Sequence, residues 1–161
     1  MYFETVKLFR SRIEVEIPCN FVDMPDYVAK KKYPSKHRPP VILMSRDTVI
    51  NYSFNLMDVP LKQEDMMRAG DGFYINMKKM TPTGCFEDLQ EITREDGMKV
   101  VSFSYEAPAV DEDIFGIIYL TAIRGKLLYG GFNCLLRDRQ IWEDTAFHTI
   151  RSIREVEQSE N

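Results

Sequence analysis

Histidine and cysteine, the side chains that most often act as nucleophiles, general bases or metal ligands, are scarce in this chain. There are two histidines, His37 and His148, and three cysteines, Cys19, Cys85 and Cys134. Cys134 with His148 would make a nucleophile–base pair, but any chain with one of each offers that pairing, so we expect Cys134 to be an inert thiol. Two imidazoles offer little for a metal site, and His148 is expected to be an ordinary helix residue. No phosphate-binding glycine loop, nucleophile elbow or HExxH motif occurs, so we predict no catalytic residue, no metal and no cofactor.

An acidic turn, Asp111-Glu112-Asp113, is the one place where several carboxylates are adjacent in the sequence. Hard cations such as Ca²⁺ take several carboxylate oxygens, which makes the turn worth weighing as a cation site. It lacks the spaced aspartates, the glycine and the distal glutamate of a calcium-binding loop. We therefore expect a solvated turn.

The densest basic cluster flanks a proline-rich loop, and we predict that it binds a partner. Its residues are Lys30, Lys31, Lys32, Tyr33, Lys36, His37 and Arg38. Pro34, Pro39 and Pro40 restrict the loop, which lowers the entropy lost on docking. In an acidic chain this cluster would orient an acidic partner. A solubilising surface with no partner is the alternative.

Two runs, Ile114–Ile123 and Leu127–Phe132, are apolar at consecutive positions, which predicts strands whose two faces are both covered. Helical segments are expected at Leu61–Met80, Asp138–Val156 and Asp26–Tyr33. Because hairpins dominate the strand order, we expect an α+β fold in which a largely antiparallel sheet lies between helical layers. This is a three-layer α/β/α sandwich.

The other expected strands are Val6–Phe9, Arg12–Ile17, Val41–Met44, Thr48–Leu56, Cys85–Thr93 and Lys99–Tyr105. In Thr48–Leu56, the polar residues Asn51, Ser53 and Asn55 alternate with apolar ones and point to the opposite face. Arg124-Gly125 is expected to form a two-residue hairpin turn, and Gly130-Gly131 a bulge. Gly70 and Gly72 inside a helix would allow close approach to the sheet or mark a kink.

Length and charge restrict the class of protein. The 161 residues favour one domain over residues 1–161, and 44% hydrophobic residues suffice for a core without disulfides. The net charge of −4 argues against nucleic acid as the main partner. No apolar run approaches the roughly 20 residues of a membrane span, and the first residues lack a signal-peptide pattern, so we expect no membrane association. Three cysteines without CxxC spacing fit the cytoplasm.

Two short segments carry a resemblance to a known group of proteins. LFRSRIEVEIPCNFVD, from Leu8 to Asp23, has an opening LF, a strand, a proline, an aromatic residue and an aspartate. This resembles the opening of PsbP-like proteins, the superfamily that includes PsbP of photosystem II, the Ran-release factor of nuclear import and DcrB-type proteins. FNCLLRDRQIW, from Phe132 to Trp142, suits the last strand-to-helix passage of that fold. The resemblance implies the α/β/α plan and a protein that acts by binding other proteins.

The expected function is therefore that of a non-enzymatic protein-binding module, a cytosolic adaptor or chaperone-like protein. A small immunity or inhibitor protein that blocks a basic target remains an alternative, since a net-negative surface would steer such a target toward it. A hydrolase whose carboxylates converge from separate elements remains a second alternative, because such a site leaves no local motif. The oligomeric state is left open.

Overall fold

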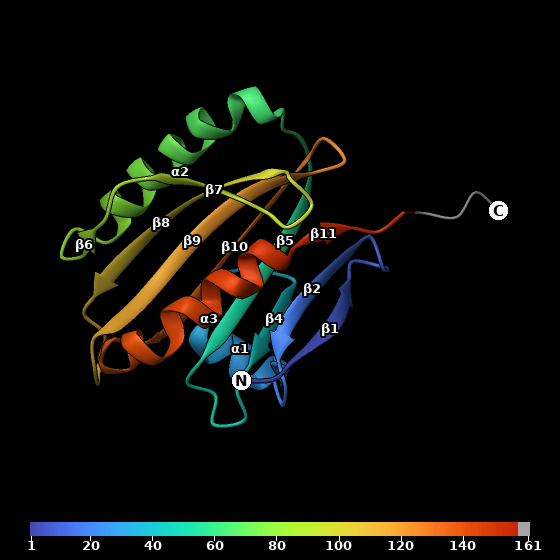
Figure 1. Cartoon of the computed structure of the whole chain (residues 1–161). Coiled ribbons are helices and arrows are strands. Elements are labelled where there is room, and N and C mark those ends of the chain that lie inside the picture. The colour runs from blue at the N-terminus through green and yellow to red at the C-terminus, as the bar shows by residue number, and fades with distance from the viewer. Residues whose placement is uncertain (158–161) are drawn as a thin grey trace.

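The computed structural model describes residues 1–157, and its centre is an eight-stranded antiparallel sheet (Figure 1). The strand order is β3-β4-β5-β10-β9-β8-β6, and β7 also pairs with β8. These strands are β3 (Val22–Asp23), β4 (Val41–Met44), β5 (Asn51–Pro60), β6 (Cys85–Phe86), β7 (Gln90–Thr93), β8 (Lys99–Ala107), β9 (Ile114–Ile123) and β10 (Lys126–Leu135). The two doubly apolar strands, β9 and β10, lie side by side in the interior, as predicted.

Helices cover both faces of this sheet, so the predicted α/β/α arrangement is confirmed. Helix α3 (Arg139–Ser152) crosses one face, in front of the sheet in Figure 1. Helices α1 (Asp26–Lys32) and α2 (Met66–Met80) pack on the other face. The largest core cluster lies under α3, where Ala146, Ile150 and Ile153 meet Phe115 and Ile117 of β9. Adjacent residues of one strand thus enter different cores, which explains the loss of alternation in Ile114–Ile123.

The N-terminal strands do not join the central sheet. Strands β1 (Phe3–Leu8), β2 (Ile13–Pro18) and β11 (Arg154–Glu155) form a separate three-stranded sheet beside α3 (Figure 1). Alternation in β2 is as expected, with Ile13, Val15 and Ile17 buried. The expected helix to Val156 is wrong at its end, because the chain pairs with β2 at β11 and Arg154 contacts Glu14 at 3.0 Å.

Other boundaries differ where the backbone bonds to a distant strand. The segment expected to open a helix at Leu61 stays extended, since its N–H donates to the oxygen of Gly125 at 2.8 Å, and a 3₁₀ turn (Gln63–Asp65) precedes α2. The expected strand Cys85–Thr93 is divided into β6 and β7. A second 3₁₀ turn, Leu136–Asp138, precedes α3.

The glycine expectations have mixed outcomes. Arg124 and Gly125 form the predicted hairpin turn with positive φ at both positions, 49° and 76°. Gly70 allows the predicted close approach, because a Cβ there would lie 2.6 Å from Val101 Cγ1. The predicted bulge at Gly130-Gly131 is wrong: the register between β10 and β5 is regular there and shifts between Lys126 and Leu128.

Among the described residues, no helix is long and apolar enough to cross a membrane.

Candidate partner-binding groove

One face of the large sheet carries a row of polar groups where β5 and β10 lie side by side. The row consists of three directly opposed pairs: Asn51–Asn133, Ser53–Gly131 and Asn55–Tyr129. A hydrogen bond to a side chain joins each pair, at 3.1, 3.0 and 2.9 Å in that order. Buried polar groups need hydrogen-bond partners, and the two strands supply them here, since Asn51 and Ser53 are only 3% and 7% exposed.

The strip of sheet that carries this row lies between the two helices that pack on this face. On one side, α1 packs on β4 through Ala29, Ile42 and Met44. On the other side, α2 packs on β8 and β9 through residues such as Met66 and Leu120. Tyr129 of the polar row packs against the α2 cluster, with its ring centroid 5.1 Å from that of Phe73, whereas Asn51, Ser53 and Asn55 belong to neither cluster. Two separate hollows open along this strip, and we call the strip together with its two hollows the groove.

The groove is apolar at the end near α2. A cavity of about 210 Å³ opens there over the main chain of Gly130 and Gly131. Its remaining lining residues are Pro39, Ser53, Phe73, Asn76, Met77, Phe103, Ile118 and Tyr129. A Cβ on Gly131 would be crowded, because it would lie 3.1 Å from the main-chain oxygen of Ile117 and 3.3 Å from Ile118 Cδ1. The size of this cavity and its mostly apolar lining suit a pocket that binds one apolar side chain.

The other end of the groove is larger and more polar. A cavity of about 590 Å³ lies two residues further along both strands, at Asn51 and Asn133. Its other lining residues are Lys31, Lys32, Tyr33, Val49, Ala109, Val110, Asp111, Glu112, Ile114 and Leu135. The predicted basic cluster and the acidic turn, far apart in sequence, therefore face each other across one hollow.

The polar end is organised by Tyr33. Its hydroxyl accepts a hydrogen bond from Asn133 Nδ2 at 3.3 Å, and Asn133 in turn accepts one from Asn51. Burial raises the pKa of Tyr33, so the phenol stays neutral and can both donate and accept. Asn51 is 3% exposed, and its Oδ1 has no hydrogen-bond partner among the described residues.

The structure divides the predicted basic cluster. Lys31, Lys32 and Tyr33 line the groove, whereas Lys30, Lys36 and His37 are exposed outside it. Lys32 donates to the oxygen of Thr48, and desolvation lowers the Lys32 pKa despite the opposing charge of Asp47. Arg38 donates from Nε to the oxygen of Tyr33 at 3.0 Å and thereby braces the loop.

The acidic turn is tied to the 3₁₀ turn that precedes α3. Glu112 contacts Arg137 at 3.0 Å, and the main-chain oxygen of Asp113 accepts a hydrogen bond from Leu136. The carboxylate of Glu112 is thus paired, and the turn forms one rim of the groove.

Cys134 lies in surroundings that favour the protonated thiol. It is 1% exposed under α3, and burial, with the carboxylates of Asp138 and Glu143, raises its pKa to about 12. A thiol with this pKa holds almost no thiolate at neutral pH. His148 lies elsewhere, against Phe3 and Glu16, and so is not placed to act as its base.

Among residues 1–157, the carboxyl groups whose pKa is clearly shifted all lie on the acidic side of their ordinary value. Three aspartates have clearly shifted pKa values, and all three are lowered. A hydrogen bond from Ser45 lowers the pKa of Asp47, and one from Lys126 lowers that of Asp58. Burial opposes ionisation of Asp96, but hydrogen bonds from Arg94 and the N–H of Met98 outweigh it. Acid catalysis by a carboxyl group needs the opposite shift.

A third hollow, of about 690 Å³, is bordered by the cations Arg12, Arg124 and Lys126. Two of these cations already have partners. Lys126 contacts Asp58 at 2.8 Å, and Arg124 donates to the main-chain oxygen of Val156. This hollow is therefore a weaker candidate for an anion site than its charge suggests.

Two arginines with many partners were not identified from the sequence. Arg94 is 2% exposed and bonds to Asp96, Thr121 and the oxygen of Ala122. Arg139, at the start of α3, bonds to three glutamates from separate parts of the chain: Glu87, Glu106 and Glu143. Both tie surface segments to the sheet, and no local pattern marks them.

No protein-family model matches the chain, and no curated protein matches it in sequence. Solved structures do match its fold. PsbP from the cyanobacterium Synechocystis aligns over 96% of this chain and 92% of its own, with a TM-score of 0.69 and 13% identity. A mutant of the protein Mog1 aligns over 98% of this chain and 98% of its own, with a TM-score of 0.62 and 14% identity. LpqN of Mycobacterium tuberculosis, described as involved in cell envelope biogenesis, aligns over 97% of this chain and 91% of its own, with a TM-score of 0.62 and 11% identity. The resemblance drawn from Leu8–Asp23 and Phe132–Trp142 is thus confirmed at the level of architecture: the chain has the PsbP-like fold.

Proposed function

We propose that this chain is a non-enzymatic binding protein that holds an extended segment of a partner protein in the groove. The observation that carries the proposal is the polar row on β5 and β10, which lies between α1 and α2 and has a hollow at each end. Side-chain amides such as those of Asn51 and Asn133 can donate to and accept from a peptide backbone. An amide-lined floor between apolar walls therefore suits a peptide better than it suits a metabolite with many charges.

The two ends of the groove define what the segment would carry. The apolar end, with Phe73, Met77 and Phe103, takes one apolar side chain. At the polar end, Lys31 forms no ion pair among the described residues and favours an acidic side chain. Glu112 on the opposite rim is already engaged by Arg137, which reduces its repulsion of an acidic group.

The wider patch Lys30–Arg38 then acts as an outer guide. Lys30, Lys36 and His37 are exposed beside the groove and would attract an acidic partner before it docks. The PsbP-like resemblance implies a role in binding proteins, which supports this assignment over a hydrolase, as do the lowered pKa values of the shifted carboxyl groups. Free thiols at the exposed Cys19 and Cys85 favour a cytosolic, adaptor-like or chaperone-like role.

Site-specific photo-crosslinking in the native cell tests the proposal. One probe replaces Val110, a fully exposed residue at the groove rim, and a control probe replaces Ile141, which is 65% exposed on α3 on the opposite side of the sheet. We expect a discrete protein adduct from position 110 only. Recovery of the same adduct from both positions would contradict docking in the groove.

Charge reversal separates the groove from its surroundings. Lys31→Glu should remove the adduct, whereas the matched change Lys79→Glu, on the exposed end of α2, should preserve it. The pair Lys30→Glu and Lys36→Glu should weaken capture mainly at low salt, because these charges act at a distance. An adduct that survives Lys31→Glu and disappears with Lys79→Glu would assign the interaction to α2.

A further inference from the structure

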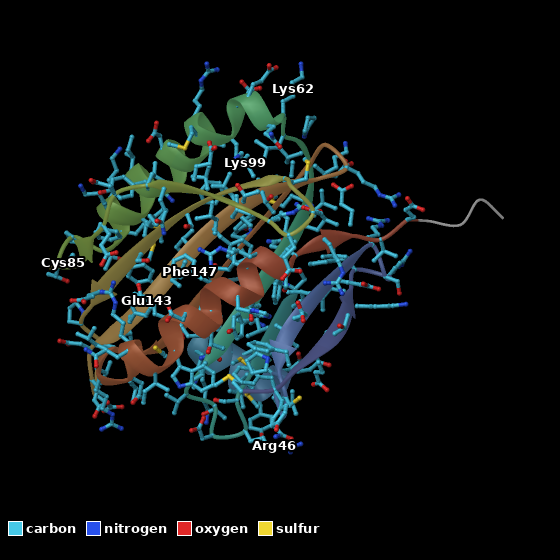
Figure 2. The ribbon with its side chains drawn as sticks, viewed as in Figure 1. Arg46, Lys62, Cys85, Lys99, Glu143 and Phe147 are labelled. Carbon is cyan, nitrogen blue, oxygen red and sulfur yellow. The ribbon has the colours of Figure 1, made fainter. Side chains whose placement is uncertain are left out.

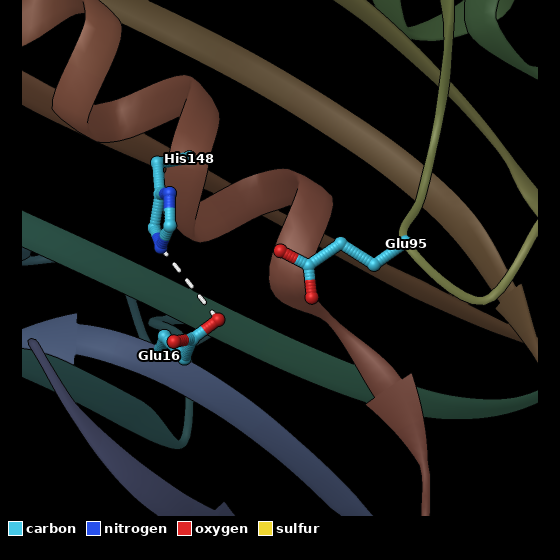
Figure 3. Close-up of side chains that lie close together, drawn as sticks. All are labelled: Glu16, Glu95 and His148. Atoms are coloured by element: carbon cyan, nitrogen blue, oxygen red, sulfur yellow. Dashed lines mark ion pairs between the residues drawn. The ribbon is translucent and has the colours of Figure 1, made fainter.

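A histidine and two glutamates from three separate elements converge on the side of the molecule that carries α3. They are Glu16 of β2, Glu95 of the β7–β8 turn and His148 of α3. One ligand atom from each lies within 4.8 Å of the other two. Figure 3 shows the two carboxylates and the imidazole directed toward one another, with His148 Nε2 at 3.6 Å from Glu16 Oε2. This site is on the opposite face of the sheet from the groove.

The main chain around the three residues is tied together. The N–H of Glu16 donates to Ser152 Oγ at 2.8 Å, and the N–H of Glu95 donates to the oxygen of Arg151 at 2.9 Å. Both anchors are in the last turn of α3, one turn after His148. The main chain that carries Glu16 and Glu95 is therefore fixed relative to α3, which contributes to the preorganisation that a metal site requires.

Two neighbours hold the side chains further. The Phe3 ring stacks on the imidazole of His148, with centroids 4.1 Å apart and an interplanar angle of 26°. Arg94, buried beneath the turn, bonds to Asp96 and to the oxygen of Ala122 and so fixes the turn that carries Glu95. Stacking orients the ring plane, as outer partners do for ligating histidines.

The charges of this cluster are unbalanced without a cation. Within residues 1–157, neither Glu16 nor Glu95 pairs with a lysine or arginine. His148 Nε2 is shielded from water and has no hydrogen-bond partner there. Two close carboxylates repel, and a buried imidazole nitrogen without a partner is costly. A divalent cation between the three groups would satisfy all of them at once.

We propose that Glu16, Glu95 and His148 form a binding site for a divalent transition metal of the Zn²⁺ type. One imidazole and two carboxylates suit Zn²⁺, Co²⁺ or Mn²⁺ better than Ca²⁺, which requires six or more oxygens. Tetrahedral Zn²⁺ ligands stand roughly 3.4 Å apart, given metal–ligand distances of about 2.0–2.2 Å. The Glu16–His148 separation of 3.6 Å is close to this spacing, and the exposed side chain of Glu95 would turn inward to complete the site.

Such a metal would join β2, the β7–β8 turn and α3 at one point and leave a fourth position open to solvent. The site is independent of the groove, so metal binding and partner binding can succeed or fail separately. Glu95 is the one exposed residue of the three, so its side chain is the least restrained of the three proposed ligands.

Calorimetric titration with Zn²⁺ tests the site. The parent protein carries Cys19→Ser and Cys85→Ser, because these exposed thiols would otherwise bind zinc. We expect one equivalent of Zn²⁺ to bind. Glu95→Gln and His148→Gln should each lower the affinity by at least about 10-fold, the smallest loss typical even of outer partners of a metal site.

The chain offers close controls for both ligands. His37→Gln changes the only other histidine, and Glu91→Gln changes an exposed glutamate on β7, so both should bind like the parent. Titration with Co²⁺ supplies a second readout, since coordination by His148 changes the visible absorption of the ion. Absence of zinc binding by the folded parent, or equal binding by Glu95→Gln, His148→Gln and the parent, would overturn the proposal.

Discussion

Tyr119 reaches across Gly130 and donates its hydroxyl hydrogen bond to the main-chain oxygen of Ser53, at 2.9 Å. Tyr119 on β9 and Gly130 on β10 are directly opposed, and Ser53 lies on the next strand, β5. The phenol thus spans the central strand on the α3 face. This explains why a glycine occupies the middle of β10 without forming a bulge: the ring of Tyr119 takes the place of a side chain.

Gly130→Ala should destabilise the protein strongly. A Cβ at this position would lie 1.9 Å from the Ser53 oxygen and 2.6 Å from the Tyr119 hydroxyl, and the nearer of these atoms is main chain that cannot move aside. Overpacking of a core typically costs about 1–3 kcal/mol, and we expect the upper part of that range because the hydrogen bond is also lost. Urea unfolding followed by circular dichroism measures the change.

Gly72→Ala is the matched control. It makes the same chemical change inside α2, but no atom lies within 4 Å of the added Cβ. Replacing a helical glycine with alanine typically stabilises by up to about 1 kcal/mol. Similar losses of stability for the two variants would show that Gly130 is not a close-approach site.

Asp96 should make stability depend on acid. Its pKa is lowered in the folded protein by hydrogen bonds from Arg94 and Met98, which outweigh burial. Because the pKa of Asp96 is lower in the folded state than in the unfolded state, its ionised form stabilises the fold at pH values above the unfolded pKa of about 4. This stabilisation disappears as the pH falls through the folded pKa. Asp96→Asn should therefore cost about 2 kcal/mol at pH 7, less than for a fully buried pair because Asp96 is partly exposed, and the gap should close toward pH 2.

Urea unfolding of both proteins between pH 7 and pH 2 measures this gap. Asp88→Asn, at an exposed position on the β6–β7 connection, is the control and should show no gap at either limit. A gap between parent and Asp96→Asn that is the same at pH 2 and pH 7 would rule out the Arg94–Asp96 ion pair as its source.

Much of the architecture was predictable because its signals are local. Unbroken apolarity in Ile114–Ile123 predicted a strand between two covered faces, and the strand has those bounds. The alternation of apolar and charged residues in Arg12–Ile17 predicted a strand with one face exposed to solvent. The failures came where a distant segment decided the outcome: β11 forms by pairing with Glu14, about 140 residues earlier, and periodicity over ten residues cannot detect that pairing.

The candidate site was predicted only at its edges. The sequence marked Lys31, Lys32 and Tyr33, and it placed Asn51, Ser53 and Asn55 on a polar face, but it could not place these two groups together. The groove depends on β10 lying next to β5, where Asn51 meets Asn133 across 82 residues of sequence. Glu16 and Glu95 were not identified for the same reason, and His148, which was considered alone, could not be placed beside them.

Thiol reactivity should distinguish the three cysteines. Cys19 and Cys85 are exposed, and Cys85 lies at the outer edge of the molecule (Figure 2). Cys134 is buried and its pKa is raised to about 12, so both access and thiolate are lacking. Ellman's reagent at pH 8 should titrate two thiols quickly in the folded protein and a third only after denaturant is added. Rapid reaction of all three thiols in the folded protein would mean that α3 separates readily from the sheet and exposes Cys134.

Hydrogen exchange should rank the strands by their place in the sheet. Strands β9 and β10 each have a long partner on both sides, and amides that open only on global unfolding exchange slowest. We expect the amides of Phe115, Ile117 and Tyr119, whose side chains are at most 1% exposed, to define the slowest class. Amides of β6 and β3, two-residue strands at the ends of the sheet, should exchange orders of magnitude faster. Exchange of Ile114–Ile123 at the rate of β6 would contradict the central position of β9, and with it the two-sided burial on which the layered fold depends.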